Sequence, residues 1–233
     1  MGKIDFDRLP QHIAFIMDGN GRWAKRRGLG RGLGHRAGFS AMVQVVERLA
    51  ELGVKYATFY AFSTENWKRS ESEIGDMFAM IREKMDEVFT NMAKMGVRIR
   101  TMGDIAKFPE DMQAKLAEAV ERTKNNTRLT VVICANYGGR AEILGAVNRL
   151  RREVGFGEID EATFGKFLQS DGIPDPDLIV RTSGEQRLSN FLLWQCAYAE
   201  LLFLEKHWPD MDKKMVDKCV VEFQKRDRRF GKV

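Results

Sequence analysis

Residues 13–21 have the sequence IAFIMDGNG, a short apolar run that stops at Asp18 and is followed by two glycines and an asparagine. Five consecutive apolar residues between polar neighbours are typical of a strand buried on both faces. A helical pattern comes next, because apolar residues between Phe39 and Ala50 recur three or four positions apart. Gly53 then stands where a left-handed residue commonly ends a helix. This segment therefore predicts a strand, a loop and a helix.

The same alternation continues along the chain. Further strands are predicted at residues 56–62, 97–101, 129–135, 178–181 and 199–204. Further helices are predicted at residues 74–92, 109–125, 140–153 and 160–168, and across 215–223. Apolar strands that alternate with helices indicate a mostly parallel sheet covered on both faces. We therefore expect an α/β fold in which residues 1–233 form a single domain around a six-stranded, mostly parallel sheet flanked by helices.

Composition excludes several classes of protein. The 233 residues are 44% hydrophobic and 30% charged, which is ordinary for a soluble globular chain and excludes bulk disorder, collagen-like repeats and low complexity. The net charge of +5 allows an anionic partner without naming one. The first residues lack the apolar segment of a signal peptide, no window is apolar enough to span a membrane, and none of the cysteines forms a CxxC pair. We therefore expect a cytoplasmic protein.

In parallel sheets, ligands bind beyond the carboxyl ends of the strands. The segment after the first strand contains Asp18 and then, from Arg22 to Arg36, six lysines and arginines and no acid. Its glycines allow backbone N–H groups to approach an anion, although neither a Walker loop nor a dinucleotide fingerprint is present. A carboxylate beside bound phosphates usually holds Mg²⁺. The segment therefore favours phosphate binding over the alternative, a solvated basic loop after an Asp-Gly turn.

Two other strands are also followed by polar, arginine-bearing loops. The loop after residues 56–62 has the sequence STENWKR, and the loop after residues 178–181 has the sequence TSGEQRLSN. Arg181 and Arg187, with hydroxyl groups between them, would suit a second phosphate. The alternatives are a helix cap for the first loop and a surface ion-pair loop for the second. Together the three loops predict a site for two phosphorylated substrates and a metal.

A methionine-rich stripe lies on one face of the helix predicted at 74–92. It includes Met77, Met85 and Val88. Such a stripe is most often ordinary core, but methionine also adapts to a flexible apolar guest. The alternative is therefore an apolar tunnel between this helix and the sheet.

Five blocks of sequence, in order, resemble the cis-prenyltransferases, and in particular the bacterial undecaprenyl diphosphate synthases. They are HIAFIMDGNGRWAKRRG, GHRAG, YAFSTENWKR, ANYGGR and RTSGEQRLSNFLLWQCAYAELLF, and the likeness runs from about His12 to Arg229. The resemblance implies an enzyme that adds isopentenyl diphosphate to an allylic diphosphate, usually farnesyl diphosphate, with cis geometry. It also implies Mg²⁺, a homodimer, and a product such as undecaprenyl diphosphate, the precursor of a lipid carrier for cell-wall synthesis. A lipid product suggests peripheral contact with a membrane, and no nucleic-acid partner is expected.

The resemblance also implies roles for individual residues. Asp18 is expected to engage Mg²⁺ and the allylic diphosphate, and Asn66 to help remove the proton. The cradle for the allylic diphosphate is expected to comprise Gly19, Asn20, Gly21, Arg22, Trp23, Arg31 and His35. The residues expected near the reacting centre or in contact with substrate are Ser63, Thr64, Glu65, Trp67 and Arg69, with the acid Glu73 just beyond. Arg181, Arg187 and Ser189 are expected to bind isopentenyl diphosphate, and Glu200 to be a second metal-linked carboxylate that acts across the dimer.

The chain departs from the family pattern at three places. Gln186 stands where some members have a metal-associated histidine, so no metal role is assigned to it. Ser70 follows Arg69 where proline is common, and Thr182-Ser183-Gly184 replaces Thr-Gly-Gly.

Two other classes of function remain as alternatives. A non-catalytic subunit would keep the fold and lose the site, but Asp18, Asn66 and both basic loops are intact. A nucleic-acid-binding protein would use the stretch Arg22–Arg36 and bind with a steep salt dependence. The carboxylate beside those arginines, and the lack of a recognisable nucleic-acid module, count against it.

Overall fold

A computed structural model describes residues 2–155 and 157–226, so the predicted domain's first residue, residue 156 and residues 227–233 lie outside it. Its strands are β1 (His12–Ile16), β2 (Tyr56–Ser63), β3 (Val97–Met102), β4 (Leu129–Tyr137), β5 (Leu178–Arg181) and β6 (Glu200–Phe203). They form one sheet in the order β3-β4-β2-β1-β5-β6, and every neighbouring pair is parallel. The predicted single domain with a six-stranded sheet is confirmed, and within the described residues the sheet is parallel throughout.

Seven α-helices connect and flank these strands. They are α1 (Asn20–Arg26), α2 (Arg31–Leu52), α3 (Glu71–Lys94), α4 (Glu110–Thr123), α5 (Gly139–Glu153), α6 (Glu161–Gly165) and α7 (Lys213–Gln224) within the described residues. Asp160, where the helix over residues 160–168 was predicted to begin, is the N-cap of α6, since its side chain accepts a hydrogen bond from the N–H of Thr163 at 2.7 Å. Pro109 has extended backbone and precedes α4 as its N-cap, so the expectation that it is the first helical residue was wrong.

The segment between Gly19 and Phe39 differs from the loop that its glycines predicted. It contains α1, and α2 begins at Arg31 rather than near Phe39. Two of the glycines that lower helix propensity here, Gly34 and Gly38, are needed for packing, because a Cβ at Gly34 would lie 2.1 Å from the carbonyl oxygen of Asn20. A Cβ at Gly38 would likewise lie 2.4 Å from the Asn20 Oδ1 atom. Close contact between α1 and α2 therefore overrides local propensity.

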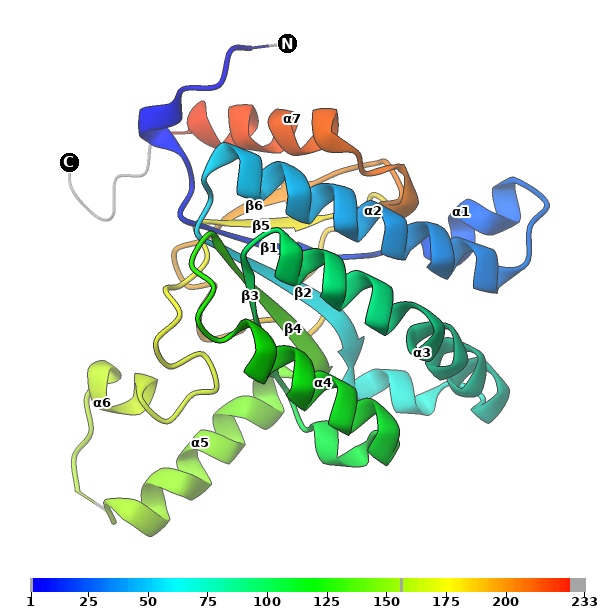
Figure 1. Cartoon of the computed structure of the whole chain (residues 1–233). Coiled ribbons are helices and arrows are strands. Elements are labelled where there is room, and N and C mark those ends of the chain that lie inside the picture. Colours follow the sequence, from blue (N-terminus) through cyan, green and yellow to red (C-terminus); the bar gives the residue numbers. More distant parts are fainter. Residues whose placement is uncertain (1, 156, 227–233) are drawn as a thin grey trace.

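The two faces of the sheet are covered differently. Helices α2, α3, α4 and α7 pack on one face through a single large apolar cluster (Figure 1). The other face packs against residues from the long connection between β5 and β6, including Phe191 and Leu192. Because all strands point the same way, the residues that follow β1, β2 and β5 meet at one edge of the sheet. None of the helices in the described part of the chain is long and apolar enough to cross a membrane.

Candidate active site

Asp18 lies between two arginines that come from distant parts of the chain. Its Oδ1 atom accepts a hydrogen bond from Arg22 Nη2 at 3.0 Å, and its Oδ2 atom accepts one from Arg181 Nη2 at 2.9 Å. Arg22 is on the first turns of α1, while Arg181 ends β5 beside Ile16 of β1. Burial alone would raise the pKa of Asp18, but the two guanidinium groups outweigh it and lower that pKa below its usual value. The carboxylate is therefore ionised at neutral pH.

The backbone of Asp18 is held as firmly as its side chain. Its carbonyl oxygen accepts hydrogen bonds from Thr182 Oγ1 at 2.7 Å, Ser183 Oγ at 3.0 Å and the N–H of Trp208 at 3.0 Å. Gly19 follows with a φ of 97°, and a Cβ there would lie 1.8 Å from Ser183 Oγ. Only glycine fits this position. The anchoring roles of Thr182 and Ser183 were not predicted, although both lie in the quoted block that begins at Arg181.

A second cationic cluster lies where α2 meets the start of α3. Arg31 Nη1 and Arg69 Nη1 both contact the same oxygen of Glu73, at 2.9 and 2.7 Å. Burial, followed by the charges of Arg69 and Arg31, lowers the pKa of nearby His35, so its imidazole is neutral at pH 7. Ser70 caps α3 by accepting a hydrogen bond from the N–H of Glu73 at 3.3 Å. Ser70 therefore orders the start of α3.

The side chain of Asn66 caps the start of the short 3-10 helix η2 (Thr64–Lys68), which follows β2. Its Oδ1 atom accepts a hydrogen bond from the N–H of Ser63 at 2.9 Å, and together these residues form a capping box. Because the oxygen is used in this way, the amide NH₂ is the part of Asn66 that remains for a ligand in the cavity. A carboxamide in this setting acts as a hydrogen-bond donor and not as a base.

Asn190 joins three segments of the site and was not predicted. Its Oδ1 atom accepts a hydrogen bond from the N–H of Arg140 at 2.9 Å, and its Nδ2 atom donates one to Glu65 Oε1 at 2.9 Å. Its neighbour Ser189 accepts a hydrogen bond from Arg181 Nη1 at 2.8 Å. Both Ser189 and Asn190 have positive φ angles, 50° and 66°, which places the loop under backbone strain. The RLSN sequence was the available signal, but sequence alone did not reveal this contact.

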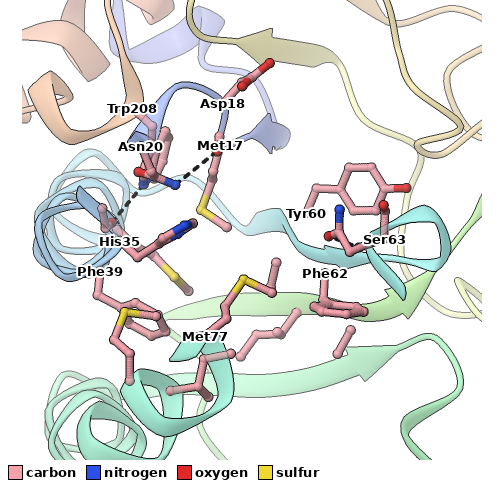
Figure 2. A pocket seen from close by; sticks show the side chains of 18 of the residues that line it. Met17, Asp18, Asn20, His35, Phe39, Tyr60, Phe62, Ser63, Met77 and Trp208 are labelled. Carbon is pink, nitrogen blue, oxygen red and sulfur yellow. Dashed lines mark hydrogen bonds between the residues drawn. The ribbon is translucent and has the colours of Figure 1, made fainter. Parts of the chain in front are cut away.

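A cavity of about 770 Å³ opens beside these groups and runs between the sheet and helices α2, α3 and α4. One end is lined by polar and cationic groups that include Asp18, Arg22, Arg31, Arg69 and Arg181. The rest is apolar, and Figure 2 shows Phe39, Phe62 and Met77 on the side of the pocket away from Asp18. This cavity is the predicted tunnel. Its lining also includes Met85 and Val88, which belong to the core cluster as well.

Most of the predicted site residues line this cavity. They are Asp18, Gly19, Asn20, Gly21, Arg22, Arg31, His35, Ser63, Glu65, Asn66, Arg69, Arg181 and Ser189. Trp23 instead donates a hydrogen bond to Asp210 at 2.7 Å, Trp67 donates one to Asn136 at 2.8 Å, and Arg187 pairs with Glu185 at 2.5 Å. The Thr64 Oγ1 atom packs against Gly138, where an added Cβ would lie 2.7 Å from it. These four side chains are not among the residues that line the cavity.

Glu200 lies away from the other predicted metal ligand of the same chain. It starts β6, paired in register with Leu178 at the amino end of β5, whereas Asp18 is beside the carboxyl end. Its carboxylate forms an ion pair with Arg226 at 2.6 Å. Among the described residues, no group of three or more His, Cys, Asp or Glu side chains could hold a metal by itself. A single partly exposed carboxylate at Asp18 does fit Mg²⁺, which is commonly held by one or two carboxylates together with substrate phosphates.

Comparisons with known proteins agree with this geometry. The family described as "Putative undecaprenyl diphosphate synthase" matches residues 16–231. An isoprenyl transferase of Clostridium perfringens is 47% identical over 230 residues, covering 97% of this chain and 91% of the relative. Isoprenyl transferase 2 of Bradyrhizobium diazoefficiens is 50% identical over 232 residues, covering 97% and 92%.

Two solved structures share the fold over almost the whole chain. Lavandulyl diphosphate synthase from Lavandula x intermedia, in complex with dimethylallyl diphosphate, superposes with a TM-score of 0.92 at 31% identity, covering 96% of this chain and 99% of that one. A "probable undecaprenyl diphosphate synthase" from Campylobacter jejuni has a TM-score of 0.81 at 32% identity, covering both chains completely. With the family pattern matched from β1 onward and relatives near half identity along its length, the chain belongs to the cis-prenyltransferases, the family of the undecaprenyl diphosphate synthases.

Proposed function

We propose that this enzyme adds isopentenyl diphosphate units to farnesyl diphosphate with cis geometry and releases a long polyprenyl diphosphate, undecaprenyl diphosphate. The shape and chemistry of the cavity beside Asp18 carry this proposal. Its cationic end suits diphosphates, and its apolar end, lined by α3 and α4, suits a hydrocarbon chain. Such a product would serve as precursor of a lipid carrier for cell-wall synthesis.

Two diphosphate sites would meet at Asp18. Arg22, Arg31 and His35 would bind the allylic diphosphate, with Arg69 beside them, and Arg181 with Ser189 would bind isopentenyl diphosphate. The contacts of Asp18 with both Arg22 and Arg181 support this arrangement, since one carboxylate touches a cation of each group. Bound diphosphates would replace Asp18 as the partner of these guanidinium groups.

The reaction breaks one bond and forms another. The C–O bond of the allylic diphosphate breaks, and inorganic diphosphate leaves with the electron pair. The double bond of isopentenyl diphosphate attacks the allylic carbon, a C–C bond forms, and the adjacent carbon loses a proton. The arginines stabilise charge on the departing diphosphate, while the apolar walls exclude water from the cation-like carbon.

The proton is assigned to an oxygen of a bound diphosphate, with Asn66 as a hydrogen-bond donor that orients that oxygen. The capping bond at Asn66 Oδ1 supports this role, because it leaves the amide NH₂ for the ligand. Asp18 is a weaker candidate for the base, since two arginines hold its pKa low.

Mg²⁺ is the proposed cofactor, and Asp18 is the residue that would hold it. When bound, Mg²⁺ neutralises charge that develops on a diphosphate leaving group. Glu200 lies at the amino ends of the strands, away from Asp18 of the same chain. In its predicted metal role, the carboxylate beside Asp18 would therefore be Glu200 of the partner subunit.

A homodimer in the cytoplasm, in contact with the membrane surface, is proposed as the working state. Exposed apolar side chains support a second copy as a partner, with Leu144 of α5 64% exposed and Leu201 on the edge strand β6 36% exposed. Static light scattering tests the dimer, and a mass near 26.7 kDa would contradict it.

A product assay tests the function. Purified protein is incubated with farnesyl diphosphate and labelled isopentenyl diphosphate, with Mg²⁺ or with EDTA, and the products are separated by chain length. We expect a Mg²⁺-dependent ladder that ends at one long polyprenyl diphosphate. Failure to extend farnesyl, geranyl and geranylgeranyl diphosphates would instead favour the non-catalytic subunit.

A further inference from the structure

The end of α1 and the start of α2 form an exposed projection. Nine consecutive residues, 25–33, are all exposed, and Figure 1 shows the turn between the two helices at one extremity of the molecule. A Cβ at Gly28, Gly30 or Gly32 would meet no atom within 4 Å. We call residues 25–33 the α1–α2 tip. No packing contact explains the glycines of this tip. Gly28 has a positive φ of 68°, which favours glycine for a conformational reason.

The tip and its flanks carry positive charge without acids. Residues 19–46 contain six lysines and arginines and no aspartate or glutamate: Arg22, Lys25, Arg26, Arg27, Arg31 and Arg36. Four of them pair with carboxylates from other segments. Lys25 and Arg26 have no ion-pair partner among the residues that the structure describes, so their charges are available to an external anion.

Two leucines lie among these cations. Leu29 is 39% exposed and Leu33 is 48% exposed, and both are flanked by glycines that have no side chain to cover them. Exposed leucines beside unpaired cations at a protruding turn are typical of a segment that anchors a protein at a membrane surface. The apolar side chains enter the boundary between headgroups and acyl chains, while the cations remain with anionic headgroups.

We propose that the α1–α2 tip is the surface by which this enzyme docks on an anionic lipid bilayer. Single-stranded nucleic acid fits less well, because base stacking needs exposed aromatic rings and residues 25–33 contain none. The nearest aromatic residue, Trp23, is covered by the guanidinium group of Arg27 at 4.2 Å and donates its N–H to Asp210.

Docking at this tip would bring the cavity to the membrane. The same two helices supply Gly21, Arg22, Arg31 and His35 to the cavity lining. The cationic end of the cavity would then lie close to the bilayer that receives the lipid product. This consequence rests on the proposed function, whereas binding of the tip to vesicles does not.

Vesicle flotation of the full chain tests the proposal. The probes are vesicles of phosphatidylcholine alone or with about 30% phosphatidylglycerol, in low salt and in about 0.5 M salt. One variant combines Leu29→Ser with Leu33→Ser, and another combines Lys25→Glu with Arg26→Glu. We expect binding only to the phosphatidylglycerol vesicles, and a loss of at least about tenfold in each double variant.

Matched controls change the same kinds of side chain at the other edge of the sheet. Lys55 and Arg128 are exposed, precede β2 and β4, and have no ion-pair partner in the described chain, so Lys55→Glu with Arg128→Glu repeats the change in net charge. Phe6, which is 64% exposed, provides the apolar control as Phe6→Ser. These controls should bind vesicles as the wild type does. Equal loss in the controls and the tip variants would overturn the proposal.

Two further readouts separate the alternatives. Tighter binding of the tip to single-stranded RNA than to anionic vesicles would overturn the proposal in favour of nucleic acid. Prenyl transfer measured in detergent, without vesicles, should be unchanged in the tip variants. If no variant and no wild-type protein elongates farnesyl diphosphate, the proposed function fails, while the vesicle result still decides whether the tip binds lipid.

Discussion

The carboxylate of Asp18 connects residues that are more than 150 positions apart in the chain. Arg22 and Arg181 neutralise it from two sides, and three donors fix its carbonyl oxygen. A residue fixed in this way has little orientational freedom to lose when a ligand binds.

Replacement of Asp18 should therefore slow turnover strongly while leaving the cations Arg22 and Arg181 of the protein in place. We expect Asp18→Asn, which keeps the shape and one hydrogen-bonding oxygen, to lower kcat by at least roughly 10²–10³, by analogy with the loss of one electrostatic stabiliser. Asp18→Ala should be as inactive and also less stable, because buried Arg181 loses its partner. Steady-state rates and circular dichroism check both variants. A folded Asp18→Asn protein with near-normal kcat would remove Asp18 from the catalytic residues.

Asn66 offers a test that distinguishes a hydrogen-bond donor from a base. Asn66→Asp keeps an oxygen to accept the N–H of Ser63, so η2 should persist, but the variant lacks the amide donor. We expect kcat to fall about tenfold or more with a smaller change in KM. Rates across a range of pH measure the effect. If Asn66→Asp equals or exceeds the wild type, a carboxylate base works at this position and the donor role is wrong.

At the scale of elements, α3 is both a core helix and a wall of the cavity. Met77 and Met85 line the cavity, whereas Met92, on the same helix, is fully buried and does not. The flexible, polarisable side chains of the first two can adapt to a hydrocarbon guest. Position along α3 therefore decides whether a methionine affects only stability or also the product.

Substitutions along α3 should separate these two effects. Met85→Ala should lengthen the distribution of polyprenyl products and Met85→Phe should shorten it, because each changes the space for the growing chain. The matched control, Met92→Ala, should destabilise the protein by about 2–5 kcal/mol and leave product lengths unchanged. Chromatography of the products and urea denaturation measure the two quantities. Identical product distributions in all three variants would assign Met85 to the core alone.

At the scale of the whole molecule, the two edges of the parallel sheet have different tasks. The carboxyl edge carries the site, and the amino edge carries structural polar contacts. His12 is 2% exposed at the amino end of β1, where Nδ1 donates to the carbonyl oxygen of Pro174 and Nε2 accepts from Thr58 Oγ1, both at 2.7 Å. Burial lowers the pKa of His12 from 6.5 to about 4, so the folded protein holds this ring neutral.

Stability should consequently fall in mild acid. Between pH 6.5 and 4 the unfolded chain binds a proton at His12 that the folded chain does not, so stability is fully present above this window and is lost as pH falls through it. The loss from His12 is at most about 3–4 kcal/mol. His12→Asn, whose amide can still donate to Pro174, should show a flatter dependence of unfolding free energy on pH. Urea denaturation at several pH values measures this slope, and equal slopes would refute the assignment.

Local pattern was enough to predict the sheet and most helices, because apolar runs and apolar repeats report which faces are buried. It also marked the loops after β1, β2 and β5 as the site, since parallel strands must bring their carboxyl ends together. Tertiary structure decided the rest. The close contact of Gly34 and Gly38 with Asn20 stabilises helices in a glycine-rich segment. The strand order places Arg181 beside Asp18, and it places Glu200 at the opposite edge of the sheet. Such contacts join residues far apart in the chain, and their energies depend on distances that no local pattern contains.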